Sequence, residues 1–448
     1  MKLCRLALLL ILIKCLTSSQ IIYEFKRNFE LKETMTEEEI YLKLSYNDIY
    51  TNIKIGTPEK ELKVGISFKE KALVLLGSNI KDREVFNEKG SSSYKPISSI
   101  YFYESQISAG NKSEEYLNLN TINKKLKINF ILATQIEKES LISNSYEPIY
   151  FSGYLGLAIN SLFQQDYPES LPIFLYENYK DEFNSAFSIK FNIKEPGNYN
   201  GKLIMNGYPH ENDKDNYHIE QYKTTRIQSI DNLNDWCFSI DNTYYGNTPV
   251  IQNNYIIFRI EIGIIIAPVN FMKHLKANYF DKYNDKCKYN TLKLMSEDYN
   301  YYVCNNDIDI KTFQDIKFEL KANDFNFTLT YKDLFYEYNK KYYFLIASGS
   351  SSLQHFILGP VLMKKYDFVF DKFKSNIGFY DFSIIVDEKN HFIIYIIIIA
   401  VLVFLIILVL IYLIWKYFNK PRNSRKNELN DDYNYISGIN AEEKEEVK

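Results

Sequence analysis

The sequence is poor in the side chains that build metal centres. It holds five His and five Cys in 448 residues. The histidines lack the spacing of metal ligands, and the scattered cysteines do not form the paired spacing of a zinc site. We therefore expect no cofactor.

The chain also lacks an excess of charge of one sign. Its formal net charge is −3, spread over mixed acidic and basic residues. Proteins that gather nucleic acid carry a concentrated basic surface, so we expect no nucleic-acid partner. The length and a hydrophobic content of 46% are sufficient to fill the cores of two ordinary domains.

An apolar run opens the chain. Residues 1–19 begin with Lys2 and Arg5, continue with the apolar stretch Leu6–Ile13, and end in small residues. This order of charged, apolar and small residues is typical of a secretory signal peptide, and the apolar part is too short to span a bilayer. The sequence therefore predicts entry into the secretory pathway.

A second apolar run, residues 392–415, contains no charged residue. As a helix it would cover roughly 36 Å, which is enough to cross the hydrocarbon core. Basic residues follow it at once, so we expect residues 416–448 to form a cytosolic tail. The prediction is a single-pass type I membrane protein of the secretory pathway or cell surface, with a lumenal or extracellular body. The sequons at Asn111 and Asn326 are glycosylation candidates on that side.

The cysteines fit an oxidising compartment. Cys4 and Cys15 fall in the predicted leader, which leaves three in the body. Cys287 and Cys304 are close in sequence and flanked by polar residues, so we predict a disulfide between them. Cys237, in an Asp-Trp-Cys-Phe segment, is predicted to be a buried strand cysteine.

The body is predicted to be mainly β. Alternating apolar positions lead into and out of a turn at Gly56, which indicates a β-hairpin with one buried face. Similar short strands are predicted at residues 128–133, 187–191, 202–205 and 318–329. The best helix candidate is residues 270–278.

The body also repeats itself. A strand hairpin followed by a distant apolar-apolar-Gly triplet occurs in each half, with Gly156 and Gly359 closing the triplets. This repeat predicts two similar lobes. We assign residues 20–40 to a short pro-like or linker segment, residues 41–194 to an amino-terminal lobe and residues 195–383 to a carboxy-terminal lobe.

Several segments, in order, resemble the pepsin-like aspartic proteases, peptidase family A1, and plasmepsins in particular. They are Ile55-Gly56-Thr57-Pro58, Ser152-Gly153-Tyr154-Leu155-Gly156-Leu157, Asn200-Gly201-Lys202-Leu203, Phe356-Ile357-Leu358-Gly359 and Val369-Phe370-Asp371 with Ile377-Gly378-Phe379. The resemblance covers residues 41–383. It implies a bilobal all-β fold with a substrate cleft between the lobes. Many members also have a disulfide where Cys287 and Cys304 fall.

The first catalytic motif of this family, Asp-Thr/Ser-Gly, is missing from the first lobe. Counting from Gly56 places the catalytic position at Ser67, followed by Phe68 and Lys69. The tyrosine of the family's flap is replaced as well, because the best register puts Phe102 there.

The second motif is missing too. Ala267-Pro268 fixes the register, which places the catalytic position at Arg259, followed by Ile260 and Glu261. A shifted alignment offers only Glu261 as an acid, and it would leave the first lobe without a partner carboxylate.

Hydrolysis by the family mechanism needs two carboxylates that share one proton, one acting as base and the other as acid. A serine is not a strong base by itself, and arginine stays protonated in proteins. With Ser67 facing Arg259, we therefore predict a non-hydrolysing pseudoprotease that binds a peptide or protein partner through its cleft or surface. The alternatives are an aspartic-type endopeptidase with a divergent catalytic site and a surface antigen with no ligand.

The former glycine positions of the two motifs now hold Lys69 and Glu261. In a pseudo-symmetric cleft these side chains would lie near each other, with Arg259 beside them. One hypothesis is an ionic cluster that holds the lobes together. The other is that these charges point into a wet cleft, where ion pairs add little stability.

A nucleophile and base are also conceivable in the segment that contains Ser348 and His355 together with Ser350, Ser351 and Ser352. The segment has no Gly-x-Ser-x-Gly elbow, and Ser/Gly runs between strands are ordinarily loops. We therefore do not assign it a catalytic role.

Overall fold

The computed structural model of the chain divides into two compact units, residues 1–384 and 385–448. We call the first unit the body. The residues that the structure describes are 20–81, 84–101, 107–122, 124–136, 151–159, 167–192, 199–229, 235–294, 297–349, 353–384 and 389–418. The predicted signal peptide, the flap position Phe102 and the predicted tail beyond residue 418 lie outside these residues.

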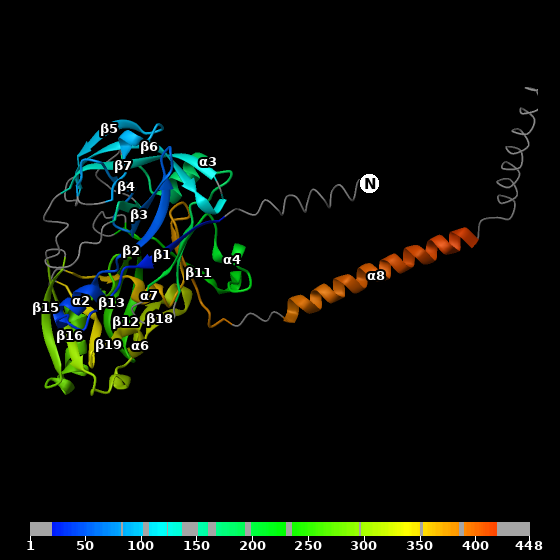
Figure 1. Ribbon diagram of the computed structural model, residues 1–448. Helices are drawn as coiled ribbons and strands as arrows, with labels where there is room; N and C mark the ends of the chain where they lie inside the picture. Colours follow the sequence, from blue (N-terminus) through cyan, green and yellow to red (C-terminus); the bar gives the residue numbers. More distant parts are fainter. Residues whose placement is uncertain are drawn as a thin grey trace, which may run out of the picture. The chain divides into compact units, whose positions relative to one another are not determined.

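Strands from both halves of the sequence form the larger of two sheets (Figure 1). Among the described residues its order is β11 (Tyr222–Arg226), β23 (Asn376–Tyr380), β22 (Phe368–Asp371), β9 (Phe187–Phe191), β10 (Gly201–Met205), β1 (Ile21–Arg27), β2 (Ile49–Ile55), β3 (Lys60–Ser67), β8 (Gly153–Gly156), β4 (Leu73–Leu76), β7 (Lys124–Ile136), β6 (Ile107–Leu119) and β5 (Lys95–Tyr101).

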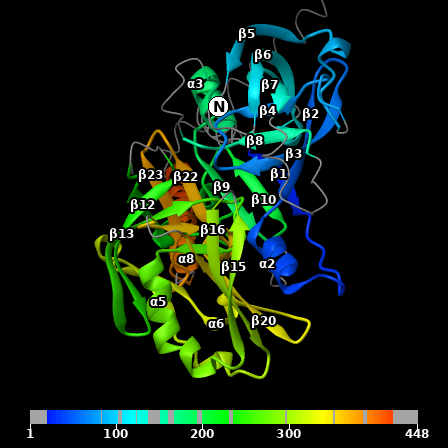
Figure 2. The ribbon, with the colours of Figure 1, turned by 90° about the vertical axis from the view of Figure 1, so that its left-hand side faces the viewer.

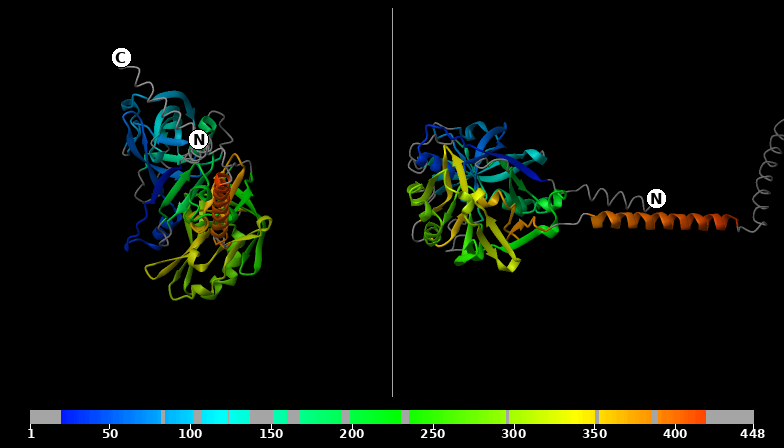
Figure 3. Two further views of the ribbon diagram at one scale, coloured as in Figure 1. Left: turned by 90° about the vertical axis from the view of Figure 1, so that its right-hand side faces the viewer. Right: turned by 90° about the horizontal axis from the view of Figure 1, so that it is seen from below.

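The second sheet comes entirely from the carboxy-terminal half. Its described strands run in the order β15 (Cys287–Leu294), β16 (Glu297–Asn305), β20 (Lys341–Ser348), β14 (Ile265–Ala267), β21 (Phe356–Leu358), β13 (Thr248–Phe258), β12 (Cys237–Tyr245), β17 (Ile316–Leu320) and β18 (Phe325–Leu329), with β19 (Phe335–Tyr338) paired to β20. Figure 3 shows the blue-to-cyan and the green-to-yellow strands gathered in different halves of the body.

Short helices connect the strands of the body. They are α2 (Glu37–Ser45), α3 (Leu171–Tyr179), α4 (Pro209–Asn212), α5 (Val269–Asn278), α6 (Tyr331–Leu334) and α7 (Pro360–Met363). The predicted helix at residues 270–278 is confirmed as α5. The predicted strands at 128–133, 187–191 and 202–205 are confirmed within β7, β9 and β10. The single strand predicted at 318–329 was wrong, because the 3-10 turn Lys321–Asn323 divides it into β17 and β18, which pair as a hairpin.

The internal repeat is visible in strand pairing. In the first lobe β3 pairs in parallel with β8, β8 pairs antiparallel with β4, and β4 pairs in parallel with β7. In the second lobe β13, β21, β14 and β20 follow with the same directions in the same order. The mainly β, bilobal fold expected from the sequence is therefore present, whereas the boundaries assigned to the lobes stay a prediction.

Residues 20–40 are more than the linker we expected. β1 pairs with β10 on one side and with β2 on the other, and α2 begins at Glu37 after a capping box formed by Thr36 and Glu39. Two signals in the sequence point to these elements: the alternation of Ile21, Tyr23 and Phe25, and the Thr-x-x-Glu spacing. The segment is thus part of the folded body.

The second unit contains α8 (Lys389–Phe418), whose side chains are described over residues 401–416. Searched over the described residues alone, the structure contains no helix of the length and apolarity needed to cross a membrane. The membrane helix expected at residues 392–415 stays a prediction.

Candidate functional site at the junction of the lobes

The two degenerate motifs sit at equivalent places in the repeat. In the first lobe β3 ends at Ser67, and the chain turns there before β4. The amide of Leu157, after β8, donates to Ser67 O over 2.8 Å. A side chain at Gly156 would come within 2.4 Å of Ala72 O, so this glycine allows the turn to lie directly on β8.

The second motif follows β13 in the same way. The Arg259 amide donates to Leu358 O over 2.9 Å. A side chain at Gly359 would come within 2.6 Å of Arg259 O and within 2.1 Å of Ile262 O. The two glycine-ended triplets identified in the sequence therefore support the two motif turns, one in each lobe.

Glu261 joins the two turns. Its Oε1 accepts a hydrogen bond from Ser67 Oγ over 2.5 Å, from Phe68 N over 2.5 Å and from Lys69 N over 2.8 Å. A carboxylate from the second motif thus satisfies three donors of the first motif turn. Hydrogen bonds to an ionised acceptor are about twice as strong as neutral ones, so this contact is a firm link between the lobes.

The Ser67 hydroxyl uses its donor and both of its acceptor positions in hydrogen bonds within the site. While its hydroxyl donates to Glu261, its Oγ accepts from the amides of Lys69 and Glu70, each over 3.1 Å. Ser67 has an exposed fraction of only 2%. The side chain at the first catalytic position therefore acts as a turn-capping group.

A second carboxyl group, Glu70, lies in this region. Burial raises the pKa of Glu70, the positive charge of Lys69 lowers it, and the negative charge of Glu261 raises it further. Glu261 Oε2 is buried and has no hydrogen-bond partner among the described residues. The site thus contains two acidic side chains, although neither occupies a family catalytic position.

The residues that follow the catalytic positions are apolar and buried. Phe68 is fully buried and its ring packs against Phe187 and Phe370, with centroids 6.0 and 5.0 Å apart. Ile260 is fully buried as well. In both turns the middle residue is therefore a core side chain.

The predicted ionic cluster is not formed. Arg259 turns to Asp235, with its Nη2 2.6 Å from the carboxylate. Within the described residues no ion pair joins Lys69 to Glu261, and the lysine contributes its backbone amide instead. The lobes are linked by a carboxylate bound to amides and a hydroxyl.

The segment before β2 contacts the second motif, which the sequence analysis missed. Asn47 Nδ2 donates to Ile260 O over 2.7 Å, and the Asn47 amide donates to Glu261 O over 2.8 Å. The amide of Gly263 donates to Ser45 O over 2.8 Å. No motif in the sequence marks these contacts, because they join positions more than two hundred residues apart.

Helix α2 is held against the second lobe beside β15 and β20 (Figure 2). The ring of Tyr41 stacks on Tyr301 with centroids 3.7 Å apart, and its hydroxyl donates to Phe344 O over 2.9 Å. Tyr41 is fully buried. The amino-terminal segment therefore covers part of the second lobe next to the motif turn.

Arg27, the last residue of β1, binds the carboxy-terminal end of α2. Its guanidinium donates to Tyr46 O over 2.8 Å and to Lys43 O over 3.0 Å. Nearby, burial raises the pKa of Asp48 to about 6, although the charges of Arg27 and Lys43 act in the opposite direction. The chain between β1 and β2 is thus anchored at both ends.

The remaining predicted residues are the cysteines of the body and the two sequon asparagines. Cys287 and Cys304 form the expected disulfide across the β15–β16 hairpin. Cys237 is buried in β12 with a free thiol, and it pairs with Ile257 at the end of β13, next to the second motif turn. Asn111 lies in β6 and is half-buried, whereas Asn326 lies in β18 and is exposed. No group of three or more metal-ligating side chains occurs within the described residues.

A β body of two lobes, with one strand-and-turn motif from each lobe meeting at their junction, defines the class of the pepsin-like aspartic proteases. The chain belongs to this family. The model of the eukaryotic aspartyl proteases matches residues 48–381. A search of curated proteins found no match to the chain.

Proposed function

We propose that this protein is a membrane-anchored, non-hydrolysing member of the aspartyl protease family that binds a peptide or protein partner. The observation that carries the proposal is the hydrogen bond from Ser67 to Glu261. It uses the hydroxyl at the first catalytic position and one carboxylate oxygen to join the lobes.

The family chemistry needs a water held between two carboxylates, one from each lobe. Here the first position supplies a hydroxyl and the second supplies Arg259, which pairs with Asp235. Neither group takes a proton from water at accessible pH. A chain that keeps the family fold but lacks a carboxylate at these two positions is suited to a binding role.

The alternative is a protease with a divergent site, and one observation favours it. Burial and the charge of Glu261 raise the pKa of Glu70. The Glu70 amide donates to Ser67 Oγ, and the same hydroxyl donates to Glu261 Oε1. The junction thus brings a carboxyl group of raised pKa and a second carboxyl group to one serine, and acid–base hydrolysis uses two such groups.

The test is to incubate the purified chain with a diverse peptide library from acidic to neutral pH. We expect no cleavage. Cleavage that disappears in both Glu261→Ala and Glu70→Gln, but persists in the surface control Glu30→Ala, would establish the divergent protease and overturn the proposal.

The membrane anchor is proposed from the apolar run at residues 392–415 and the basic residues that follow it. Extraction of cell membranes with alkaline carbonate tests it. The chain should remain with the membrane, and protease added to sealed vesicles should remove only the tail. Release into the soluble fraction would contradict the anchor.

The partner is to be found by proximity labelling of the tagged chain in its own cells. Labelled proteins should include one that also binds the purified chain directly. If the same proteins are labelled by a membrane-anchored control that lacks the body, the binding role is refuted.

A further inference from the structure

One corner of the body, close to the point where the chain leaves it, carries exposed apolar side chains. Ile219 is exposed by 57% and Phe382 by 48%. Ile219 begins the short 3-10 helix η3 (Ile219–Gln221), and Phe382 follows β23. We call the surface formed by η3, α4 and residues 380–384 the exit corner.

Hydrogen bonds make the exit corner one continuous surface. The Asp381 amide donates to Gln221 O over 2.8 Å, and Gln221 Nε2 donates to Ile384 O over 3.1 Å. The ring of Phe382 lies 5.9 Å from that of Tyr217. Ile219 and Phe382 are therefore carried on two segments that are fastened to each other.

Beneath these apolar side chains lies a cluster of tyrosines. Tyr380 Oη lies 2.8 Å from His210 Nδ1, and Tyr217 Oη donates to Asp367 over 2.7 Å. The rings of Tyr217 and Tyr380 are 4.8 Å apart. This packing gives the exposed Ile219 and Phe382 a rigid base.

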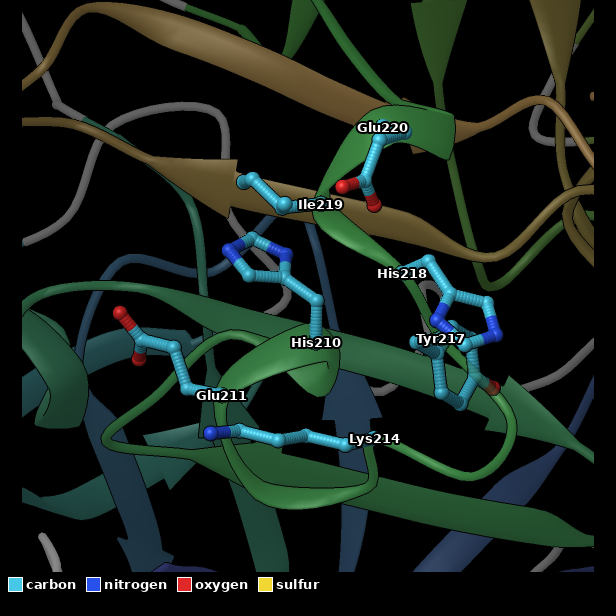
Figure 4. Close-up of a pocket in the computed structure, with 7 residues that line it drawn as sticks. All are labelled: His210, Glu211, Lys214, Tyr217, His218, Ile219 and Glu220. Atoms are coloured by element: carbon cyan, nitrogen blue, oxygen red, sulfur yellow. The ribbon is translucent and has the colours of Figure 1, made fainter. Parts of the chain in front are cut away.

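An open pocket of about 470 Å³ lies in the same corner (Figure 4). Its lining includes one cationic side chain, Lys214, and two acidic ones, Glu211 and Glu220. Such a lining offers no attraction for the phosphate of an anionic lipid, which favours a zwitterionic lipid as the occupant of this surface.

We propose that the exit corner rests on a phosphatidylcholine membrane surface, with Ile219 and Phe382 inserted at the level of the headgroups. The inference rests on the proposed membrane anchor. Only residues 385–388 join Ile384 to α8, and a chain of this length spans at most about 18 Å. Anchoring by α8 therefore keeps the exit corner close to the bilayer, where exposed apolar and aromatic side chains gain from contact with lipid.

The experiment uses the full chain reconstituted into phosphatidylcholine vesicles. An environment-sensitive fluorophore is attached to Ile219→Cys, and its quenching by lipid spin-labelled near the headgroup is measured. Ile97→Cys is the matched control, because Ile97 is exposed by 46% on β5, the strand at the opposite edge of the sheet from β11. The fluorescence of the unsubstituted chain after the same labelling reaction is subtracted as background.

At Ile219→Cys the spin-labelled lipid should reduce emission about twofold, as expected for a side chain at the interface, and Ile97→Cys should be unaffected. Phe382→Cys should behave as Ile219→Cys does, which guards against a folding defect in one variant. Equal quenching at all three positions, or none, would overturn the inference while the anchor stands. A chain that does not float with the vesicles would refute the anchor and the inference with it.

Discussion

Ser67 Oγ donates a hydrogen bond to Glu261 Oε1 over 2.5 Å, and the two residues are 194 positions apart in the sequence. The donor ends β3 of the first lobe, and the acceptor belongs to the turn that follows β13 in the second lobe. One hydrogen bond thus joins the two turns that we predicted to correspond to the catalytic motifs of the family.

Removing the acceptor should weaken the body. Glu261→Ala leaves the Ser67 hydroxyl and the Phe68 amide without their acceptor, whereas the Lys69 amide keeps Ser67 Oγ. Since unsatisfied donors in a partly buried site are costly, we expect a loss of about 3 kcal/mol in the free energy of unfolding, and about 1 kcal/mol for Glu261→Gln, which keeps an acceptor oxygen. Denaturant unfolding of the purified chain measures both. Glu30→Ala, at an exposed position, should be neutral, and an equally neutral Glu261→Ala would show that the link contributes nothing.

A carboxyl group introduced at position 67 should make the stability of the body depend on pH. Ser67→Asp places a second acid against Glu261 Oε1, in the position from which the hydroxyl now donates. Two carboxyl groups at this distance cannot both ionise, so the introduced group should hold its proton to a higher pH in the folded chain than in the unfolded one.

The stability of Ser67→Asp should therefore fall as pH rises through the pKa of the introduced group. The penalty relative to the unsubstituted chain should be larger at neutral than at acidic pH. Thermal unfolding at both pH values checks this, with Ser67→Asn as the uncharged control. A penalty that does not change with pH would place Glu261 away from position 67.

The amino-terminal helix is expected to contribute to the stability of the whole body. Tyr41→Ala removes a fully buried ring that stacks on Tyr301, and large-to-small changes of this kind cost about 3–5 kcal/mol. Tyr41→Phe keeps the ring and loses only the hydrogen bond to Phe344 O, at about 1 kcal/mol. Glu38→Ala, on the exposed side of the same helix, is the control. If Tyr41→Ala unfolds like the control, α2 contributes nothing to the stability of the body.

The buried carboxyl group of Asp48 should make the free energy of unfolding depend on pH. Burial raises its pKa to about 6 in the folded chain, whereas an unfolded aspartate titrates near 4. The folded state therefore binds the proton more tightly. The stability from this group is fully present below about pH 4 and is lost as pH rises through about 6.

The variant Asp48→Asn should remove this loss. Between about pH 4 and 7 the free energy of unfolding of the unsubstituted chain should fall by up to about 2 kcal/mol more than that of the variant. Denaturant unfolding of both chains across this pH range measures the two changes. Asp324→Asn, at an exposed position, should follow the unsubstituted chain, and parallel curves for Asp48→Asn would contradict the prediction.

Much of the fold was predictable because it depends on local patterns. The alternation around Gly56 gave the β2–β3 hairpin, the spacing of Cys287 and Cys304 gave their disulfide, and the paired triplets ending at Gly156 and Gly359 predicted two similar lobes. In the first two cases residues near one another in sequence carry the signal, and in the third the recurrence of a short local pattern carries it.

The candidate site was predictable only in part. Counting along the chain predicts Ser67 and Arg259 as the counterparts of the catalytic positions, and this stays a prediction. The partner of Arg259 is Asp235, so the ionic cluster that we expected with Glu261 was wrong. The role of residues 20–40 was missed although Ile21, Tyr23 and Phe25 alternate, because a short apolar alternation next to a leader also fits an unstructured linker.

By itself the sequence determined which side chains the two turns hold, Ser67-Phe68-Lys69 in one and Arg259-Ile260-Glu261 in the other, since residue identity needs no tertiary contact. Only the tertiary structure decided which of these side chains bond to one another. Which of Lys69, Arg259 and Asn47 meets Glu261 depends on how two lobes and an amino-terminal segment close on one another. Side-chain contacts between such distant positions are set by packing, which no local pattern records.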